Sequence, residues 1–272
     1  MEQFVSSDGT RIGCERSGSG SPLVLVHGGT ADRTRWAPVV PALARHFTVY
    51  AMDRRGRGAS GDAAAYALER EFEDVAAVVD AIGGPVDLLG HSFGGICALG
   101  AARRSPNVRR LVLYEPPPTG VPGTIPPAVA DRLAALLASG DRDGVVTTFM
   151  REIVRVPPGE LETLRSLPAW QGRVAAAHTI LREVLAVEGH PPLDPAQLRT
   201  FETPTLLLLG GDSPAGDRAH AQALKAALPN SRIAVMPGQR HVAMNTAPDL
   251  FVAEVLAFLT EPDRSPATPA AP

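Results

Sequence analysis

The sequence has few cysteines and no long hydrophobic segment, and both absences limit what the protein can be. Its two cysteines, Cys14 and Cys97, lie far apart, so neither a disulfide framework nor a structural zinc site is expected. No apolar run approaches the length of a membrane-spanning helix. The first residues lack the basic and apolar regions of a secretory signal peptide. These absences predict a cytoplasmic protein without a membrane partner.

Positive charge is neither abundant nor clustered in the sequence. The chain of 272 residues carries a formal net charge of -3, and lysine and arginine form no run or stripe. A nucleic-acid partner is therefore not expected. Hydrophobic residues make up 44% of the chain and charged residues 20%, which is the balance of a globular enzyme. The length suits one large domain or one core with an insertion. We expect a monomer or homodimer that acts on a small-molecule substrate.

Strand-like and helix-like segments alternate along most of the chain, which is typical of an α/β fold with a mostly parallel sheet. Short apolar runs that end at glycine or polar turns predict strands at 23–26, 47–52, 86–89, 111–114, 205–209 and 233–236. Apolar residues at helical spacing predict helices at 36–45, 72–82, 219–227 and 250–259.

The alternation breaks between residues 116 and 203, where proline pairs punctuate helix-like pieces. Insertions of this length are usually functional lids or binding caps. We therefore predict a core of residues 1–115 and 204–260 and a helical lid of residues 116–203. A helical subdomain that only covers the sheet edge is the alternative. The tail, 261–272, is rich in proline, alanine and serine, which predicts disorder.

The pentapeptide Gly90-His91-Ser92-Phe93-Gly94 follows a predicted strand and opens into a helix-like stretch. A serine in this strand–turn–helix context has a strained backbone and projects its hydroxyl beyond the carboxyl end of the sheet. Ligands of α/β sheets bind at that edge. We interpret Ser92 as a nucleophile rather than as a simple helix N-cap.

A serine nucleophile needs a base within hydrogen-bond reach. The chain has seven histidines, and His241 is the one that follows the last predicted strand. A loop at that position can place an imidazole over Ser92, so we expect His241 to be the base. His27 and His91 flank tight glycine turns, and we interpret both as structural.

The base in turn needs a carboxylate that orients it. Asp212 lies just past the strand at 205–209 and is the preferred candidate. The chain order Ser–Asp–His that results is the order expected on this sheet topology. Glu115, which follows the strand at 111–114, is a rival, and Asp217 is a weaker one.

Five segments in order resemble motifs of the α/β-hydrolase fold superfamily of esterases, lipases and haloperoxidase-like serine hydrolases. They are 26–29, 53–60, 90–95, 211–212, and Gly238 with His241. The resemblance covers nearly all of residues 4–260 and implies a mostly parallel eight-stranded sheet flanked by helices. It also implies an oxyanion hole formed by the backbone N–H groups of Gly29 and Phe93, and a mechanism that requires no cofactor and no metal.

The predicted function is a serine hydrolase that cleaves an ester, or a related acyl bond, of a small hydrophobic substrate. The candidate pocket residues are Thr30, Trp36, Phe149, Trp170 and His178, although Trp36 fits a helix core better. The same triad would suit a C–C bond hydrolase, a lactonase, or a perhydrolase or non-metal haloperoxidase. A ligand-binding receptor of this fold is a further alternative. Serine rather than aspartate at the nucleophile position argues against epoxide hydrolase and haloalkane dehalogenase chemistry.

Overall fold

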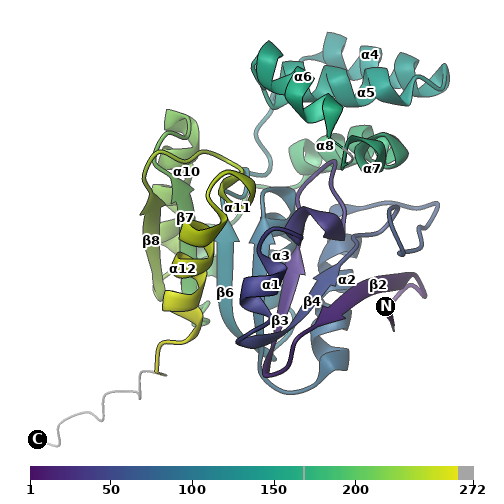
Figure 1. Cartoon of the computed structure of the whole chain (residues 1–272). Coiled ribbons are helices and arrows are strands. Elements are labelled where there is room, and N and C mark those ends of the chain that lie inside the picture. The colour runs from purple at the N-terminus through teal and green to yellow at the C-terminus, as the bar shows by residue number, and fades with distance from the viewer. Residues whose placement is uncertain (168, 263–272) are drawn as a thin grey trace, which may run out of the picture.

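The computed structural model describes residues 1–167 and 169–262. Its centre is an eight-stranded sheet with the strand order β1-β2-β4-β3-β5-β6-β7-β8 (Figure 1). The strands are β1 Glu2–Val5, β2 Arg11–Ser17, β3 Ser21–Val26, β4 Phe47–Met52, β5 Val86–His91, β6 Val108–Tyr114, β7 Thr205–Gly210 and β8 Ser231–Met236. β2 runs antiparallel to both β1 and β4, and the later pairings are parallel. The predicted fold class is confirmed.

Helices cover both faces of the sheet, which explains why its central strands are continuous apolar runs. One face packs against α2 (Leu68–Ile82), α3 (Phe93–Ala102) and α10 (Ala215–Ala227). The other face packs against α1 (Val40–Leu43), α11 (Ala243–Thr246) and α12 (Pro248–Leu259). β5, which leads into the candidate nucleophile, is buried along its whole length.

The helix predicted at 36–45 is broken in the structure. A 3-10 turn, η1 (Arg33–Trp36), comes first, and α1 follows after a gap. Pro38 and Pro41 lie in this stretch, and proline cannot donate the backbone hydrogen bond that a continuous helix requires. Trp36 is nonetheless fully buried in the core, where its ring packs against Phe251.

Between β6 and β7 the chain leaves the sheet and forms a separate group of helices. They are α4 (Pro127–Ala138), α5 (Arg142–Thr148), the π-helical η2 (Phe149–Ile153), α6 (Pro158–Ser166), α7 (Ala169–Ala175), the 3-10 turn η3 (Ala177–Thr179), α8 (Ile180–Gly189) and α9 (Pro195–Leu198). Figure 1 shows α4 to α8 as a layer beyond one end of the sheet. Leu133, Val145 and Ile180 belong to a hydrophobic cluster within this layer. We call residues 116–203 the insertion.

The end of the chain was predicted to be disordered from residue 261. Residues 263–272 of that tail lie outside the described residues. Within 1–167 and 169–262, no helix has both the length and the apolar content that crossing a membrane requires.

Candidate active site

Ser92 lies in the sharp turn between β5 and α3. Its backbone angles, φ 54° and ψ -126°, fall in a region that residues with a side chain rarely adopt. The strand and helix pass so closely that a Cβ atom on Gly90 would collide with the carbonyl of Gly94. The turn is held further by the Ser92 N–H, which donates to the carbonyl of Tyr114 at 2.8 Å. The close packing of β5, α3 and β6 therefore fixes the position of Ser92.

Glu115 and His241 form a hydrogen-bonded pair at the same edge of the sheet. The distance from His241 Nδ1 to Glu115 Oε2 is 2.7 Å. The other carboxylate oxygen, Oε1, accepts hydrogen bonds from the Gly210 N–H at 2.8 Å and from Ser213 Oγ at 2.6 Å. The Glu115 side chain is only 2% exposed. Its carboxylate is thus fully partnered and directed at the imidazole.

The structure corrects the choice of Asp212 as the acid beside His241. Asp212 is exposed, and its backbone N–H donates to the carbonyl of Gln239 at 2.9 Å. The described contacts include no hydrogen bond or ion pair between Asp212 and His241, whereas Glu115 occupies that place. Glu115 follows β6, the strand next to β5, so its side chain begins closer to the turn at Ser92. An acidic residue directly after that strand was the sequence signal for it.

The environment of Glu115 keeps its carboxyl group ionised. Burial alone would raise the pKa of Glu115. The hydrogen bond and the charge of His241, together with the donors Ser213 and Gly210, outweigh burial and lower this pKa below its ordinary value of 4.5. A carboxylate can only accept, so the proton of a neutral His241 lies on Nδ1 and Nε2 is free to act as a base.

Two buried side chains hold the loop that carries His241. The Tyr114 hydroxyl donates to the carbonyl of Arg240 and accepts the N–H of Ala243 at 3.0 Å. His91 Nε2 lies 2.7 Å from the carbonyl of His241, and the two histidine rings are 4.7 Å apart. Burial holds the pKa of His91 well below its ordinary value, so the ring is neutral and donates from Nε2. His91 therefore has the structural role predicted for it.

The described hydrogen bonds include none between Ser92 Oγ and His241 Nε2. In ligand-free enzymes such a bond is often long and shortens when the substrate binds. The position of the imidazole is nevertheless set by its neighbours, because its ring nitrogen, its carbonyl and the following turn are all held by buried partners.

The residues predicted to form an oxyanion hole lie next to Ser92. A Cβ atom on Gly28 would come within 3.0 Å of Ser92 Cβ, so the loop that contains Gly29 runs against the serine. The His27 ring donates from Nδ1 to the Gly28 carbonyl at 2.8 Å and accepts a backbone N–H at Nε2, which fixes this loop. Phe93 is the first residue of α3, and the N–H of a first helical residue has no acceptor within the helix.

A buried cluster of four charges lies behind this loop. Arg54 pairs with Glu71 at 2.7 Å and with Glu183 at 3.0 Å, and Arg57 also pairs with Glu183. The Arg54 guanidinium stacks 4.0 Å above the Phe93 ring. Two positive and two negative charges balance one another. Because Glu183 belongs to α8, the cluster joins the insertion to the core; nothing in the local sequence around Glu183 signals this role.

Three of the five predicted pocket residues are packed into hydrophobic cores. Trp36 belongs to the core of the sheet, as its helix-core interpretation expected. Trp170 is buried in the core of the insertion, and its indole N–H donates to Asp143 at 2.6 Å. Phe149 packs half-buried against the same cluster. These aromatic side chains therefore stabilise the core of the sheet and the core of the insertion.

The other two predicted pocket residues lie where the insertion meets the core. Thr30 follows Gly29 and is buried; its φ of 54° places it in the left-handed region. His178 is half-exposed and lies 3.9 Å from Asp62. It borders a hollow of about 450 Å³. The hollow is lined mainly by the 56–62 turn and by α7, and its charged residues are Asp32, Arg57 and Asp62.

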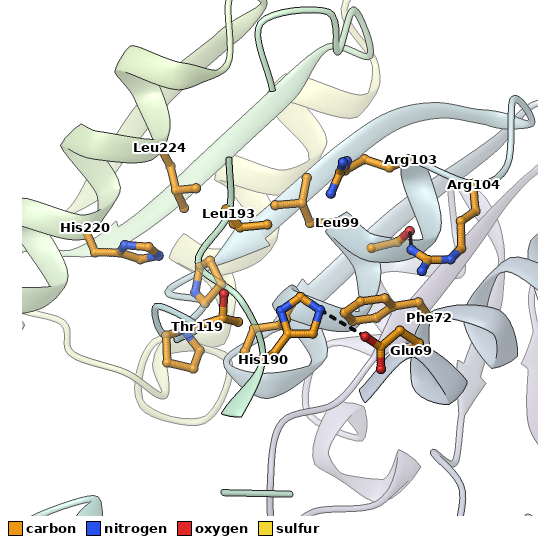
Figure 2. Close-up of a pocket in the computed structure, with 14 residues that line it drawn as sticks. Glu69, Phe72, Leu99, Arg103, Arg104, Thr119, His190, Leu193, His220 and Leu224 are labelled. Carbon is orange, nitrogen blue, oxygen red and sulfur yellow. Dashed lines mark hydrogen bonds and ion pairs between the residues drawn. The ribbon is translucent and has the colours of Figure 1, made fainter. Parts of the chain in front are cut away.

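A smaller hollow of about 100 Å³ lies among α2, α3, α10 and the two ends of the insertion (Figure 2). Its lining is mainly apolar, and two of its polar side chains have partners in the core. Arg104 donates to the carbonyl of Gly100 and stacks over Phe72, and His190 lies 3.5 Å from Glu69. Its lining does not include Ser92, Glu115 or His241.

Within the described part of the chain, no three His, Cys, Asp or Glu residues are grouped as metal ligands would be. Cys14 and Cys97 are both buried. Burial raises the pKa of each thiol above its ordinary value of 9.0, so both stay protonated at neutral pH. We interpret the two cysteines as small apolar core residues.

Known proteins resemble this chain over most of its length. A crystal structure of an alpha/beta hydrolase from Sphaerobacter thermophilus DSM 20745 superposes with a TM-score of 0.83 at 43% identity, covering 95% of this chain and 100% of that one. A 2-hydroxy-6-oxo-6-(2'-aminophenyl)hexa-2,4-dienoic acid hydrolase of Metapseudomonas resinovorans is 26% identical over 96% of this chain and 91% of its own length. A pimeloyl-[acyl-carrier protein] methyl ester esterase of Nitrosomonas europaea is 27% identical, with coverages of 89% and 96%.

A further match is to a segment of a longer protein. The chain is 29% identical to part of the polyketide synthase ThaQ of Burkholderia thailandensis, over 93% of this chain but only 12% of that protein. The family model described as "Alpha/beta hydrolase family" matches residues 23–254, which include Ser92, Glu115 and His241. By its sheet and this match, the chain belongs to the alpha/beta hydrolase family.

Proposed function

We propose that this protein is a serine hydrolase with the triad Ser92, His241 and Glu115. The observation that carries the proposal is the bond of 2.7 Å between His241 and the buried Glu115 carboxylate, at the sheet edge where the strained turn presents Ser92. A nucleophile, a base and an orienting acid on three neighbouring loops are the arrangement that acyl transfer requires.

In the proposed reaction, Ser92 Oγ attacks the substrate carbonyl while His241 Nε2 takes the hydroxyl proton. Glu115 stabilises the imidazolium that forms. His241 then gives the proton to the departing alcohol, which leaves an acyl group on Ser92. Water, deprotonated by His241, attacks this ester, and the acid departs as the proton returns to Ser92 Oγ. Bonds and protons balance, and Glu115 stays ionised throughout.

The proposed oxyanion hole consists of the N–H groups of Gly29 and Phe93. Donors of this kind stabilise the tetrahedral intermediate, and removal of one typically costs about 10²–10³ in rate. The buried cluster supports their position, because Arg54 stacks on the Phe93 ring and donates to the Gly28 carbonyl at 3.3 Å. We infer that the insertion serves as a lid, since its Glu183 joins this cluster.

We propose an ester of a small hydrophobic acid as the substrate. A relative named as a methyl ester esterase supports this choice. A relative named as a hydrolase of a hexa-2,4-dienoic acid supports C–C bond hydrolysis as the second candidate. The triad serves both reactions, because each begins at a carbonyl carbon.

Labelling with a fluorophosphonate probe tests the proposed mechanism. The purified protein should form a covalent adduct, and peptide mass spectrometry should place it on Ser92. A panel of p-nitrophenyl esters, lactones and vinylogous diketones then distinguishes among the reactions. Failure to label Ser92, with no turnover of any member of the panel, would favour a ligand-binding role.

Tyr114→Phe should lower kcat for p-nitrophenyl acetate about 10-fold. The substitution leaves the carbonyl of Arg240 and the N–H of Ala243 without their shared partner, at a cost of about 1–3 kcal/mol of stability per buried group. The His241 loop would then hold its imidazole less firmly. Urea unfolding and steady-state kinetics measure the two effects. Tyr50→Phe, at a position without a described hydroxyl hydrogen bond, is the control, and an unchanged kcat in Tyr114→Phe would contradict the role of this anchor.

A further inference from the structure

The hollow of about 100 Å³ shown in Figure 2 lies directly behind Glu115. Pro116, which lines it, is the next residue of the chain, and Ile96 of its wall lies four residues after Ser92 on α3. A Cβ atom on Gly95 would come within 3.0 Å of Pro116 Cβ, so α3 and the start of the insertion pack closely here. The hollow is thus separate from the proposed triad, but its wall begins at the residue bonded to Glu115.

The two ends of the insertion meet at this hollow. Thr119 Oγ1, at the first end, donates to the carbonyl of Pro191, at the second end, at 3.1 Å. The N–H of Gly120 also donates to the carbonyl of Val187 at 2.9 Å. Three helices of the core, α2, α3 and α10, form the opposite walls. A molecule in the hollow would therefore contact both ends of the insertion and the core at the same time.

The walls of the hollow suit a short apolar group. Its apolar side chains are Phe72, Ile96, Leu99, Leu193 and Leu224. Burial of a hydrocarbon tail among such side chains is favourable, because it removes apolar surface from water. A cavity of about 150 Å³ holds a benzene molecule. The smaller volume of about 100 Å³ therefore fits a tail of about four carbons.

Two arginines lie where the hollow opens to solvent, and neither is paired with an acid. Arg103 and Arg104 both line the hollow and are both exposed. Arg103 donates to the side chain of Gln197, and Arg104 donates to the carbonyl of Gly100 at 2.9 Å. Among the described residues, no carboxylate lies within 4.0 Å of either guanidinium. An arginine has five N–H donors, so each of these keeps donors for a ligand.

The remaining polar groups also favour an anion with a hydrogen-bonding head. Glu69, the one acid in the lining, lies 3.5 Å from His190, so the two arginines leave the lining with a net positive charge. His220 of α10 is half-buried and has no hydrogen bond or ion pair among the described residues. Burial lowers the pKa of His220 below its ordinary value of 6.5, so the ring is neutral at pH 7 and keeps one N–H donor. Figure 2 shows this ring directed from α10 toward the hollow.

From this arrangement we propose that the hollow binds a short aliphatic carboxylate. Its tail of about four carbons lies among the apolar walls, and its carboxylate is held by Arg103, Arg104 and His220. The bound molecule bridges the two ends of the insertion and the core helices, and so restrains the insertion. The site lies outside the proposed triad, so the inference does not depend on hydrolysis. A ligand of this size is expected to bind with a Kd of about 1 mM.

A matched pair of ligands tests the charged head. Valerate and 1-pentanol have the same number of carbons, and calorimetry on the parent protein should show valerate binding about 10-fold more tightly. Arg103→Gln combined with Arg104→Gln should lower the affinity for valerate about 10-fold and that for 1-pentanol less than about 2-fold. Equal affinity of the parent protein for the two ligands would overturn the carboxylate site. Arg151→Gln, at an exposed arginine of the insertion, is the charge control and should bind valerate as the parent protein does.

Variants of Leu193 test the place of binding. Leu193→Phe fills the hollow and should lower the affinity for valerate at least about 10-fold, while Leu193→Ala enlarges it and should favour heptanoate over valerate. The urea midpoints of both variants show whether the fold is kept. Valerate held at the proposed triad, as an acid product would be, should still bind to Leu193→Phe. Unchanged binding to both variants would therefore overturn the hollow as the site.

Hydrogen exchange tests the restraint on the insertion. The N–H groups of Gly120 and His190 are bonded to the carbonyls of Val187 and Ala186, within the two ends of the insertion. At valerate concentrations of ten times Kd, their exchange should slow by about 10-fold, because these ends open only after the ligand has left. Binding without any slowing would overturn the bridging of the two ends. Neither measurement uses an ester, so a failure of the proposed function would leave both results standing.

Discussion

Ser92→Ala is expected to reduce the turnover of p-nitrophenyl acetate by about 10⁶-fold, which is the effect of removing the nucleophile in a comparable serine hydrolase. Without Oγ no acyl-enzyme forms. The donors at Gly29 and Phe93 remain, so the variant should still accelerate hydrolysis about 10³–10⁴-fold over the uncatalysed reaction in water. Initial rates and titration of the p-nitrophenol burst measure the loss.

The fold of this variant should be preserved. The substitution removes one oxygen, while the turn at φ 54° is imposed by the packing of β5 against α3. Far-UV circular dichroism and the urea midpoint should therefore match the parent protein. Ser166→Ala, at an exposed position of α6, is the matched control and should keep full activity. Activity above about a tenth of the parent value in Ser92→Ala would remove Ser92 from the mechanism.

The sequence predicted the sheet well because its strands carry a local signal. Each predicted strand lies inside an observed one, since buried parallel strands are short apolar runs that end in turns. The prediction of a continuous helix at 36–45 was wrong. Its apolar spacing was correct, but Pro38 and Pro41 prevented continuous backbone hydrogen bonding. Hydrophobic periodicity indicates which side chains face the core. It does not indicate whether the backbone between them can form the hydrogen bonds of a continuous helix.

The parts of the site that depend on local backbone conformation could be predicted from the sequence. The parts that depend on side chains far apart in the sequence could not. The turn at Ser92 is a local feature, and the glycines beside it reveal it. The partner of His241 depends on which loop end comes closest in space, and two acids after neighbouring strands could not be separated by chain order. Glu183 carries no motif. Its role in the buried cluster is evident only when the insertion is placed against the core, because the burial of its charge is what makes the residue informative.

Glu115→Gln should reduce kcat by about 10⁴-fold, which is the effect of the corresponding acid-to-amide change in another serine triad. The amide can donate to His241, which favours the wrong tautomer and removes the charge that stabilises the imidazolium. Asp212→Asn should change kcat less than about 3-fold, because exposed side chains without such partners contribute little. The kinetics of these two variants on one ester, at pH 7, separate the two candidates; a large loss in Asp212→Asn with normal activity in Glu115→Gln would restore Asp212.

The pH dependence of stability offers an independent test of Glu115. Its pKa is lower in the folded protein than the ordinary value of 4.5, so its ionised form stabilises the fold. This contribution is fully present above about pH 4.5 and is lost as the pH falls through the lower, folded value. The difference in unfolding free energy between the parent protein and Glu115→Gln should therefore be smaller at pH 3.5 than at pH 5. Urea unfolding at these pH values measures it, and a difference that grows on acidification would contradict an ionised Glu115 held by His241.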